Sequence, residues 1–466
     1  MQPNCGLRIA DCEPFRYSAF RIPHFAFRGS ALALFSCVMA VIFLVGADRA
    51  GANEVLAGAA REAFVLPEHV PLAGYSRRKG KPSTGIHDTV GVRALVMEAD
   101  GVTAALVSCE VLIIDEILAQ AVRRRLLERG LPKDIELLLA ATHTHSGPGA
   151  YGGRFLEKLS MGHFDPAVFE ALTETMTRTI LQAYADRRPV RYVYRTARTE
   201  HLVVNRMDPR GLSDDELTVS AFYAAETPYP VAVVVGFSAH PTTLGAWNTA
   251  MSGDYPGVLM RAIERHWPQT HCLFVAAAVG DQAPRNMGEG YERSEWFGDQ
   301  LAQHVLALLL APQPEPPLTM RVHREALRLP GARVRVGSRL TLPHWVSRLF
   351  VDDDATLSLV RLGRLVYVGV PCDLEAAMGH QIKHAVRARG WEPIIVGFAN
   401  DYIGYCVSEA TYRTGRYEAL MAFNGPLAGQ VVVERLIQML DALATSDQQP
   451  ATRGPLELDG SRPDSP

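Results

Sequence analysis

Apolar residues follow the chain in two kinds of spacing, and each kind predicts a different element. Short apolar runs rich in β-branched residues predict strands at residues 90–97, 104–108, 135–140, 190–198, 231–237, 272–278, 364–370 and 394–398. Apolar residues that recur three or four positions apart predict helices at residues 111–129, 167–184, 256–266, 296–310 and 426–443. Residues 55–75 show neither spacing, so we expect an irregular segment there.

Predicted strands alternate with predicted helices through most of the chain, and no internal repeat or Gly/Ser linker interrupts them. This alternation is typical of an α/β protein, here of mixed α+β character. We therefore expect one large domain over residues 55–445. The tail, residues 446–466, is rich in Pro, Asp, Gly and Gln, and we expect it to be disordered.

The N-terminal part of the chain has a different pattern. Residues 29–47, "GSALALFSCVMAVIFLVGA", carry no charge, and the basic segment 1–28 precedes them. A basic flank followed by an apolar stretch indicates an export signal or a signal-anchor, with a buried core helix as the alternative. We expect an exported protein, periplasmic or otherwise extracytoplasmic, that is either secreted or associated with the membrane through residues 29–47.

Composition and charge narrow the class of protein. Hydrophobic residues make up 48% of the chain and charged residues 21%, which is typical of a globular protein. The 47 Lys and Arg residues nearly balance the 50 Asp and Glu residues, for a net charge of −3. Without a basic run or patch in the sequence, we expect no nucleic-acid partner.

The first candidate for chemistry follows the apolar run at 135–140. The string "THTHSGPG" places His143 and His145 two residues apart, so both side chains lie on one side of an extended segment and can bind one ion. Two loop histidines without a metal are the alternative. Metallo-β-lactamase-like enzymes continue with Asp and His after this pair, whereas Ser146-Gly147 follows here, which excludes that class. Amidohydrolase barrels place the pair at their first strand, and the two or more predicted strands that precede it here disfavour that class.

Five further strings extend this candidate down the chain. They are "LVVNRMDP" with Asn205-Arg206, "VVVGFSAHPTTLGAWNTAMSGDYPG" with His240 and Asp254, "AAAVGDQAPRN" with Asp281, "VYVGVPCDLEAAMG" with Asp373, and "ANDYIGYCVSEATYRTGRYE" with Tyr402, Tyr405 and Tyr417. In this order, over roughly residues 85–430, the motifs resemble those of the neutral/alkaline non-lysosomal ceramidase family. Asp373 stands where that family has a zinc-binding Glu.

The resemblance implies a zinc-dependent amidase that cleaves the N-acyl bond of ceramide or of a related N-acyl lipid. It implies one Zn²⁺ held by His143, His145, His240, Asp373 and Tyr405. Imidazole nitrogens and a carboxylate suit Zn²⁺, and a ligand set with an open position admits water or substrate.

One departure from the family pattern affects the expected mechanism. The family places a nucleophilic serine where this chain has Ala283. We expect a water molecule activated by the metal to attack instead. Asp281 or an imidazole would orient the water or move its proton, and Tyr417 and Arg206 would bind the developing oxyanion or the headgroup.

Several alternatives remain open from the sequence. One alternative is a site that acts on another amide, an ester or a lactone, and another is a non-catalytic protein that retains metal or binds lipid. Glu110 could hold a second, structural divalent ion, and Cys372 and Cys406 could pair because each flanks a proposed ligand. Residues 340–351 could form a lipid-facing element at the mouth of the site, with a buried surface helix as the alternative. The resemblance also leads us to expect the catalytic domain without the family's C-terminal β-sandwich.

Overall fold

A computed structural model describes residues 55–446, with the exception of 286, 316–318 and 338–339. The predictions for residues 1–28 and 29–47, and those for the tail from residue 447 onward, lie outside the described residues. No helix in the described ranges is long and apolar enough to cross a membrane. The description below concerns the part of the chain after residue 54.

The larger of two main sheets has eight strands in the order β11-β9-β8-β6-β1-β3-β4-β5. These strands are β1 (Leu56–Ala63), β3 (Gly91–Ala99), β4 (Val102–Cys109), β5 (Glu136–Ala141), β6 (Arg188–Arg198), β8 (Glu216–Ala224), β9 (Ala232–Phe237) and β11 (His271–Ala276). Only the edge pairs β4–β5 and β9–β11 are parallel. β1 joins β6 over two residue pairs, and β11 lies against β3, β4 and β5, so the two halves of the sheet curl toward each other.

A second sheet of four strands, in the order β13-β16-β17-β19, packs on the first. Its strands are β13 (Met320–Arg328), β16 (Asp354–Leu362), β17 (Leu365–Gly369) and β19 (Glu392–Val396). Side chains from both sheets, such as Leu106 and Tyr367, share one buried cluster between them. Two-stranded pairs complete the strands: β2 (Gly85–Ile86) with β10 (Ala250–Met251), β7 (Val203–Asn205) with β12 (Gln282–Pro284), β14 (Arg335–Val336) with β15 (Leu340–Thr341), and β18 (Asp373–Leu374) with β20 (Tyr405–Cys406).

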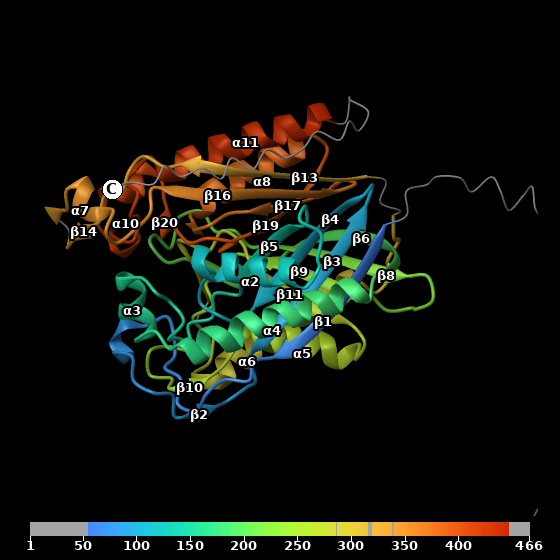
Figure 1. The fold of residues 1–466 in the computed structure, drawn as a ribbon, viewed down its shortest axis with the longest axis horizontal. Coiled ribbons are helices and arrows are strands. Elements are labelled where there is room, and N and C mark those ends of the chain that lie inside the picture. Colours follow the sequence, from blue (N-terminus) through green and yellow to red (C-terminus); the bar gives the residue numbers. More distant parts are fainter. Residues whose placement is uncertain (1–54, 286, 316–318, 338–339, 447–466) are drawn as a thin grey trace, which may run out of the picture. The chain divides into compact units, whose positions relative to one another are not determined.

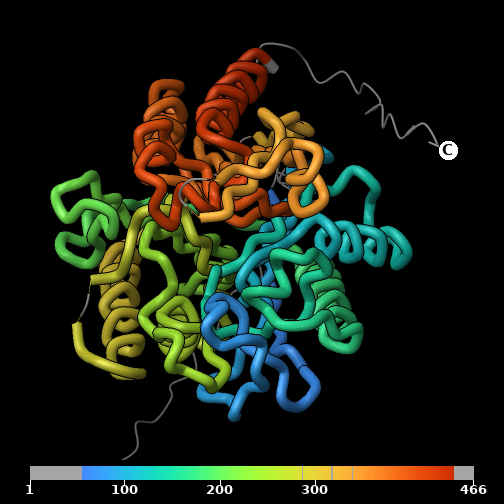
Figure 2. Tube along the Cα trace, turned by 90° about the vertical axis from the view of Figure 1, so that its left-hand side faces the viewer, coloured from blue at the N-terminus to red at the C-terminus, as the bar shows by residue number. Residues whose placement is uncertain are grey.

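Helices cover the outer faces of both sheets and give four layers (Figure 1). Beside the large sheet lie α2 (Glu116–Glu128), α4 (Pro166–Ala185), α5 (Asp254–His266) and α6 (Gly290–Leu308). Beside the small sheet lie α8 (Ala376–Ala388) and α11 (Ala428–Ser446). Short helices occur in the connections: η1 (Ser76–Arg78), α3 (Phe155–Met161), α7 (His344–Ser347), α9 (Glu409–Arg413) and α10 (Tyr417–Leu420). Figure 2 shows these connections from the end where α3, α7 and α10 lie.

The predicted α/β class of mixed character is confirmed, and most predicted elements occur near their expected positions. The expectation of an irregular segment at 55–75 is wrong in its first part, because β1 pairs along its whole length with β3. Strands β8, β13 and β16 and helix α8 were not predicted. In β13 charged residues alternate with apolar ones, "MRVHREALR", so the strand has no continuous apolar run.

Helix α2 begins five residues later than the predicted helix at 111–129, and the difference matters for the site. The Asp115 side chain accepts a hydrogen bond from Leu118 N and caps the helix. Residues 111–114 are therefore not helical. Their carbonyl groups remain free to accept hydrogen bonds from the segment that carries the first histidine pair: Val111 O from His143 N, and Leu112 O from the His143 ring.

Candidate metal centre and pocket

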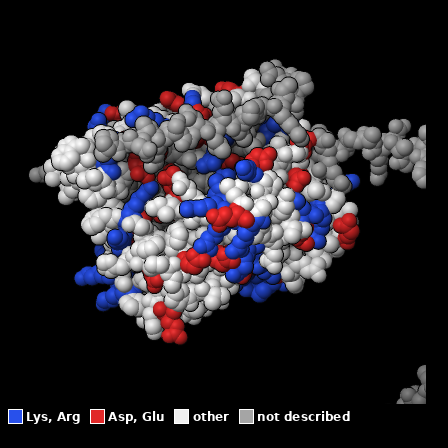
Figure 3. Space-filling view, in the orientation of Figure 1, with Lys and Arg blue, Asp and Glu red and all other residues white. Residues whose placement is uncertain are grey.

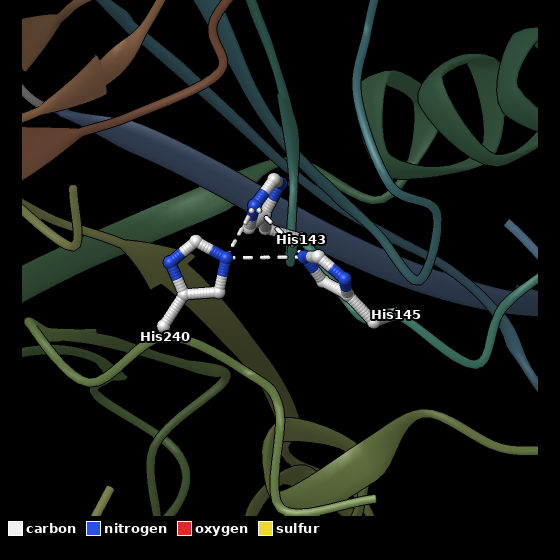
Figure 4. A group of neighbouring side chains, drawn as sticks. All are labelled: His143, His145 and His240. Carbon is white, nitrogen blue, oxygen red and sulfur yellow. Dashed lines mark hydrogen bonds between the residues drawn. The ribbon is translucent and has the colours of Figure 1, made fainter. Parts of the chain in front are cut away.

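Three histidines meet at one point, in the segments that follow two strands of the large sheet. His143 and His145 follow β5, and His240 follows β9. The three side chains come from segments almost a hundred residues apart and point toward one another (Figure 4). All three are buried, and within the described ranges they form the group of His, Cys, Asp or Glu side chains able to hold a metal ion. The predicted histidine part of the ligand set is thus brought together.

The nitrogens of these rings have the spacing that a metal requires. The Nε2 atoms lie 3.0 Å apart for His143 and His240, 3.1 Å for His145 and His240, and 3.3 Å for His143 and His145. Nitrogens bound at about 2.0–2.1 Å to one tetrahedral Zn²⁺ would be about 3.3 Å apart. The three distances are close to that value, so the histidines fit a single ion of this kind.

The other ring nitrogens determine which atoms face the centre. His143 Nδ1 lies 2.7 Å from Leu112 O, and His240 Nδ1 lies 3.2 Å from Val279 O. A carbonyl only accepts, so His143 Nδ1 carries the proton and His143 Nε2 presents a lone pair. His240 Nδ1 lies near both the Val279 carbonyl and Arg206 Nη1, which only donates. Burial lowers the pKa of His143 to about 3 and the pKa values of His145 and His240 well below their usual value. Three neutral imidazoles whose Nε2 atoms converge at this distance offer a cation three nitrogen ligands.

Asp373 supplies a carboxylate beside the histidines. Its Oδ1 lies 3.4 Å from His143 Nε2 and has no hydrogen-bond partner, although the residue is fully buried. Its Oδ2 accepts a hydrogen bond of 2.7 Å from the Tyr402 hydroxyl. Burial raises the pKa of Asp373 to about 7. A buried oxygen without a partner is rare, and a metal at the histidine centre would provide one.

Tyr405 lies next to Asp373 because the parallel pair β18–β20 places the two residues opposite each other. Its hydroxyl accepts a hydrogen bond of 3.0 Å from Arg206 Nη2. Burial, with a further contribution from Asp373, raises the pKa of the phenol well above its usual value. Without a metal, Tyr405 is therefore a neutral phenol between a carboxylate and a guanidinium group.

Arg206 is held in place by several partners. Beyond Tyr405, its Nη2 donates to Gly280 O at 2.7 Å and its Nε donates to Glu418 Oε1 at 2.9 Å. Its Nη1 lies 3.3 Å from His240 Nδ1. The guanidinium group thus has a fixed position at the edge of the histidine centre, as the predicted role in binding developing negative charge requires.

The carboxylate of Asp281 has a different environment from the one expected. Oδ2 accepts a hydrogen bond of 2.7 Å from Asn205 Nδ2, and Oδ1 accepts one of 2.9 Å from Ala376 N at the start of α8. Its main-chain oxygen accepts from Arg206 N. These contacts hold β7, β12 and α8 together beside Arg206. Ala283 lies in β12 opposite Val204, and neither Asp281 nor Ala283 lines the pocket described next.

A small pocket of about 90 Å³, partly open to solvent, leads to the histidine centre. Its polar end contains His143, His145, Asp373, Tyr402, Tyr405 and Tyr417. Tyr417 begins α10 and is half exposed, with its ring 5.8 Å from that of Tyr405. The walls are largely apolar and include Leu112, Ile113, Leu156, Met161, Phe350, Val351, Met421 and Phe423. The lining therefore suits an apolar group better than a polar one.

Three residues that position the site had no role in the sequence-based prediction. Phe398 stacks on the His143 ring, Tyr402 fixes Asp373, and Gly74 packs beneath His145. Gly74 has a φ of +104°, and a Cβ there would lie 2.7 Å from the His145 side chain, so only glycine fits. Of these three residues, only Tyr402 could have been found from the sequence, because it is the first tyrosine of the "NDYIGY" string.

The two minor predictions have distinct outcomes. Glu110 is buried, accepts hydrogen bonds from Gly91 N and Arg93 Nη1, and lies 3.6 Å from Arg261. The charged partners of Glu110 are thus two arginines. A second divalent ion at this residue stays a prediction. Cys372 and Cys406 are both buried free thiols, so the pairing is not present in the structure.

Comparisons with known proteins agree with this arrangement. Residues 66–296 match the family described as neutral/alkaline non-lysosomal ceramidase, N-terminal. The chain is 21% identical to a neutral ceramidase of Mycobacterium tuberculosis over 82% of this chain and 76% of that protein. It is 24% identical to neutral ceramidase 1 of Arabidopsis thaliana over 65% of this chain, a match that spans only 40% of that relative.

A solved structure shares the fold. The crystal structure of the neutral ceramidase from Pseudomonas aeruginosa superposes with a TM-score of 0.76 at 20% identity. The superposition covers 87% of this chain and 77% of that chain. The α/β arrangement of the described residues is therefore the one found in that protein.

Proposed function

Residues 66–296 belong to the family of the neutral/alkaline non-lysosomal ceramidases, and from this premise we propose that the chain is a zinc-dependent hydrolase of N-acyl lipids. The reaction adds water across the amide bond of ceramide or a related lipid and yields a fatty acid and an amine. The observation that carries the proposal is the convergence of three neutral imidazoles and a carboxylate oxygen without a partner at the end of an apolar pocket.

The proposed ion is Zn²⁺, held by His143, His145, His240 and Asp373, with Tyr405 beside them. When bound, such an ion polarises the acyl carbonyl and lowers the pKa of a water molecule. Tyr402 keeps the Asp373 carboxylate oriented through its hydroxyl. The Leu112 carbonyl fixes the tautomer of His143, so its Nε2 lone pair stays directed at the centre, and the Val279 carbonyl would accept from His240 Nδ1 when His240 Nε2 binds the ion.

The remaining polar residues act on the substrate. Arg206 is fixed by Glu418 and the Gly280 carbonyl, and its charge stabilises the oxyanion that develops on the acyl oxygen. Tyr417 lines the pocket, and its phenol keeps its proton at neutral pH and can donate a hydrogen bond to the substrate. We assign Asp281 a positioning role, because both of its carboxylate oxygens hold other parts of the fold.

The apolar walls of the pocket hold the acyl chain and exclude water from it. Burial of each methylene group contributes about 0.8 kcal/mol, so a long acyl chain supplies much of the binding free energy. We further propose that the chain is exported, on the basis of the apolar stretch at residues 29–47 and its basic flank.

Purified protein incubated with N-acylsphingosines of several acyl lengths tests this proposal. We expect fatty acid release that a zinc chelator abolishes and added Zn²⁺ restores. His240→Gln removes one ligand and should abolish release, whereas His271→Gln, at a histidine outside the centre, should not. Turnover limited to other amides, esters or lactones would overturn the substrate class. Tight zinc binding with no turnover on this panel would indicate a non-catalytic protein.

A further inference from the structure

The mouth of the pocket exposes large apolar side chains to solvent. Helix α3 contributes two of them, α7 and the residues after it contribute two, and the β14–β15 hairpin contributes two more. They are Phe155, Leu159, Trp345, Leu349, Val336 and Leu340, between 54% and 74% exposed. We call these six residues the mouth patch. Scattered exposed apolar residues are common, but a contiguous group beside a pocket marks an interaction site.

In α3, Phe155 and Leu159 are four residues apart, and residues at this spacing are neighbours on a helix surface. Trp345 lies in α7, and Leu349 lies in the turn that follows this helix. The two segments also touch, because the Phe155 ring lies 5.7 Å from the ring of Phe350. Phe350 and the next residue, Val351, line the pocket itself. The mouth patch is therefore continuous with the interior of the pocket.

The segments that carry the patch are firmly packed. Ala332, Val334, Val351 and Phe423 form a small core beneath α7, and Leu156 of α3 packs against it. Arg154 and Asp352 form an ion pair that ties the start of α3 to the end of the α7 segment. The apolar side chains are thus presented to solvent by an ordered scaffold.

Cations lie next to the patch. Arg77, Lys79 and Lys81 are exposed in and after η1, and Lys158 is exposed on α3. The two segments are in contact, since Gly74 N donates to Ser160 O and a Cβ on Gly80 would lie 3.0 Å from Gly162 Cα. Among the described residues, no carboxylate forms an ion pair with any of these four cations. Figure 3 shows mostly uncharged side chains at the upper left, where α7 and β14 lie, with both basic and acidic side chains below them.

We propose that the mouth patch and these four cations form a docking surface for a membrane with anionic lipids. Aromatic and aliphatic side chains enter the boundary between headgroups and acyl chains, while Lys and Arg remain at the anionic surface. Docked in this way, the pocket opens into the lipid, and an acyl chain reaches the histidine centre without crossing water. Docking does not depend on the reaction proposed above.

Charge complementarity selects this occupant over a second copy of the chain. Two copies that met through the patch would bring eight exposed cations close together, and none of the four in each copy forms an ion pair among the described residues of its own chain. An anionic lipid surface neutralises the same cations. The net charge of the whole chain is −3, so attraction to such a surface must come from the local grouping of cations.

Tryptophan fluorescence gives a local test in the full-length protein. The chain has five Trp residues, and Trp345 and Trp247 are the two that are largely exposed in the described ranges. We would add vesicles of phosphatidylcholine and phosphatidylserine in which the phosphatidylcholine carries brominated acyl chains, which quench tryptophan on contact. We expect quenching that Trp345→Phe largely removes and that the matched control Trp247→Phe leaves intact. Because the signal comes from Trp345 itself, binding through other segments does not mimic it.

Two further variants examine the parts of the surface separately. Phe155→Ser with Leu349→Ser should reduce the quenching of Trp345, and Lys79→Gln with Lys81→Gln should reduce it only when phosphatidylserine is present. Leu310→Ser, at an exposed leucine that does not line the pocket, should have no effect. Quenching that is absent, or that persists in Trp345→Phe, would overturn the proposal. So would concentration-dependent dimers that Trp345→Ser dissociates. If the protein shows quenching but hydrolyses no N-acyl lipid, the proposed reaction is wrong and the docking surface stands.

Discussion

The imidazole of His143 stacks on the phenyl ring of Phe398, with the ring centroids 3.9 Å apart and the planes inclined by 7°. Both residues have left-handed backbone conformations, with φ of 64° for His143 and 54° for Phe398. Such conformations are unfavourable for side chains of this size and persist where the surrounding structure enforces them. Here they bring the ends of β5 and β19 together, so that the first metal-ligand candidate is held by a residue from the other sheet.

We expect Phe398→Leu to weaken zinc binding about tenfold, because residues that orient a ligand typically contribute 10–100-fold to metal affinity. Leucine keeps the pocket apolar but lacks the flat ring that holds the imidazole. Competition with a fluorescent zinc chelator measures the change. Phe297→Leu is the control. Phe297 in α6 is equally buried, but its ring packs against Tyr255 in α5 and not against a histidine of the centre. Equal losses in both variants would show that the effect is general destabilisation.

Arg206→Lys should lower kcat at least tenfold while leaving the zinc content unchanged. A lysine keeps the positive charge but cannot bind Glu418, the Gly280 carbonyl and Tyr405 together, so the charge loses its fixed position. Steady-state kinetics on an N-acyl lipid, with zinc measured on the same sample, provide the test. Arg321→Lys, at a surface ion pair with Asp100, serves as the control. An unchanged kcat would remove Arg206 from the proposed mechanism.

Ala283→Ser should not raise turnover more than about threefold. A serine nucleophile needs a general base within hydrogen-bonding distance. The nearest carboxylate along the chain is Asp281, and its two oxygens are taken by Asn205 and Ala376. Turnover per bound zinc in the variant and the wild-type protein decides the matter. A gain of a hundredfold would mean that the site is a serine-dependent one that has lost its nucleophile.

Asp401→Asn should stabilise the protein more at pH 8 than at pH 5. Burial raises the pKa of Asp401 from 3.8 to about 7, so the folded state holds a proton that the unfolded state has released in this range. The wild-type protein therefore loses stability as the pH rises from about 4 to about 7, by at most about 4 kcal/mol. Asparagine keeps the oxygen that accepts from Tyr402 N but cannot ionise. Urea unfolding at both pH values measures the difference. A gain that is equal at both would show that ionisation of Asp401 is not its source.

Local sequence patterns predicted the elements that are buried on both faces. β5, β9, β11, β17 and β19 contain continuous apolar residues, and the α/β class follows from their alternation with helices. β13 and β16 were missed, because their polar residues alternate with apolar ones. The start of α2 depends on the Asp115 cap, a short-range signal that the longer apolar periodicity concealed.

The order of the motifs along the sequence identified the candidate ligands of the site. The contacts between these side chains came from the structure. The structure brings His143, His145 and His240 within reach of one ion and places Asp373 beside them. The sequence contained no sign that Phe398 stacks on His143, because that contact joins residues 255 positions apart. It also could not show that Asp281 binds Asn205 and the start of α8, since α8 itself was not predicted. Such contacts depend on how the two sheets pack.

Anomalous diffraction from crystals of the protein, recorded above and below the zinc absorption edge, tests the central claim most directly. We expect one peak within about 2.0–2.2 Å of the three Nε2 atoms and of Asp373 Oδ1, present above the edge and absent below it. A histidine centre without a peak, or a zinc peak bound by other residues, would contradict the account.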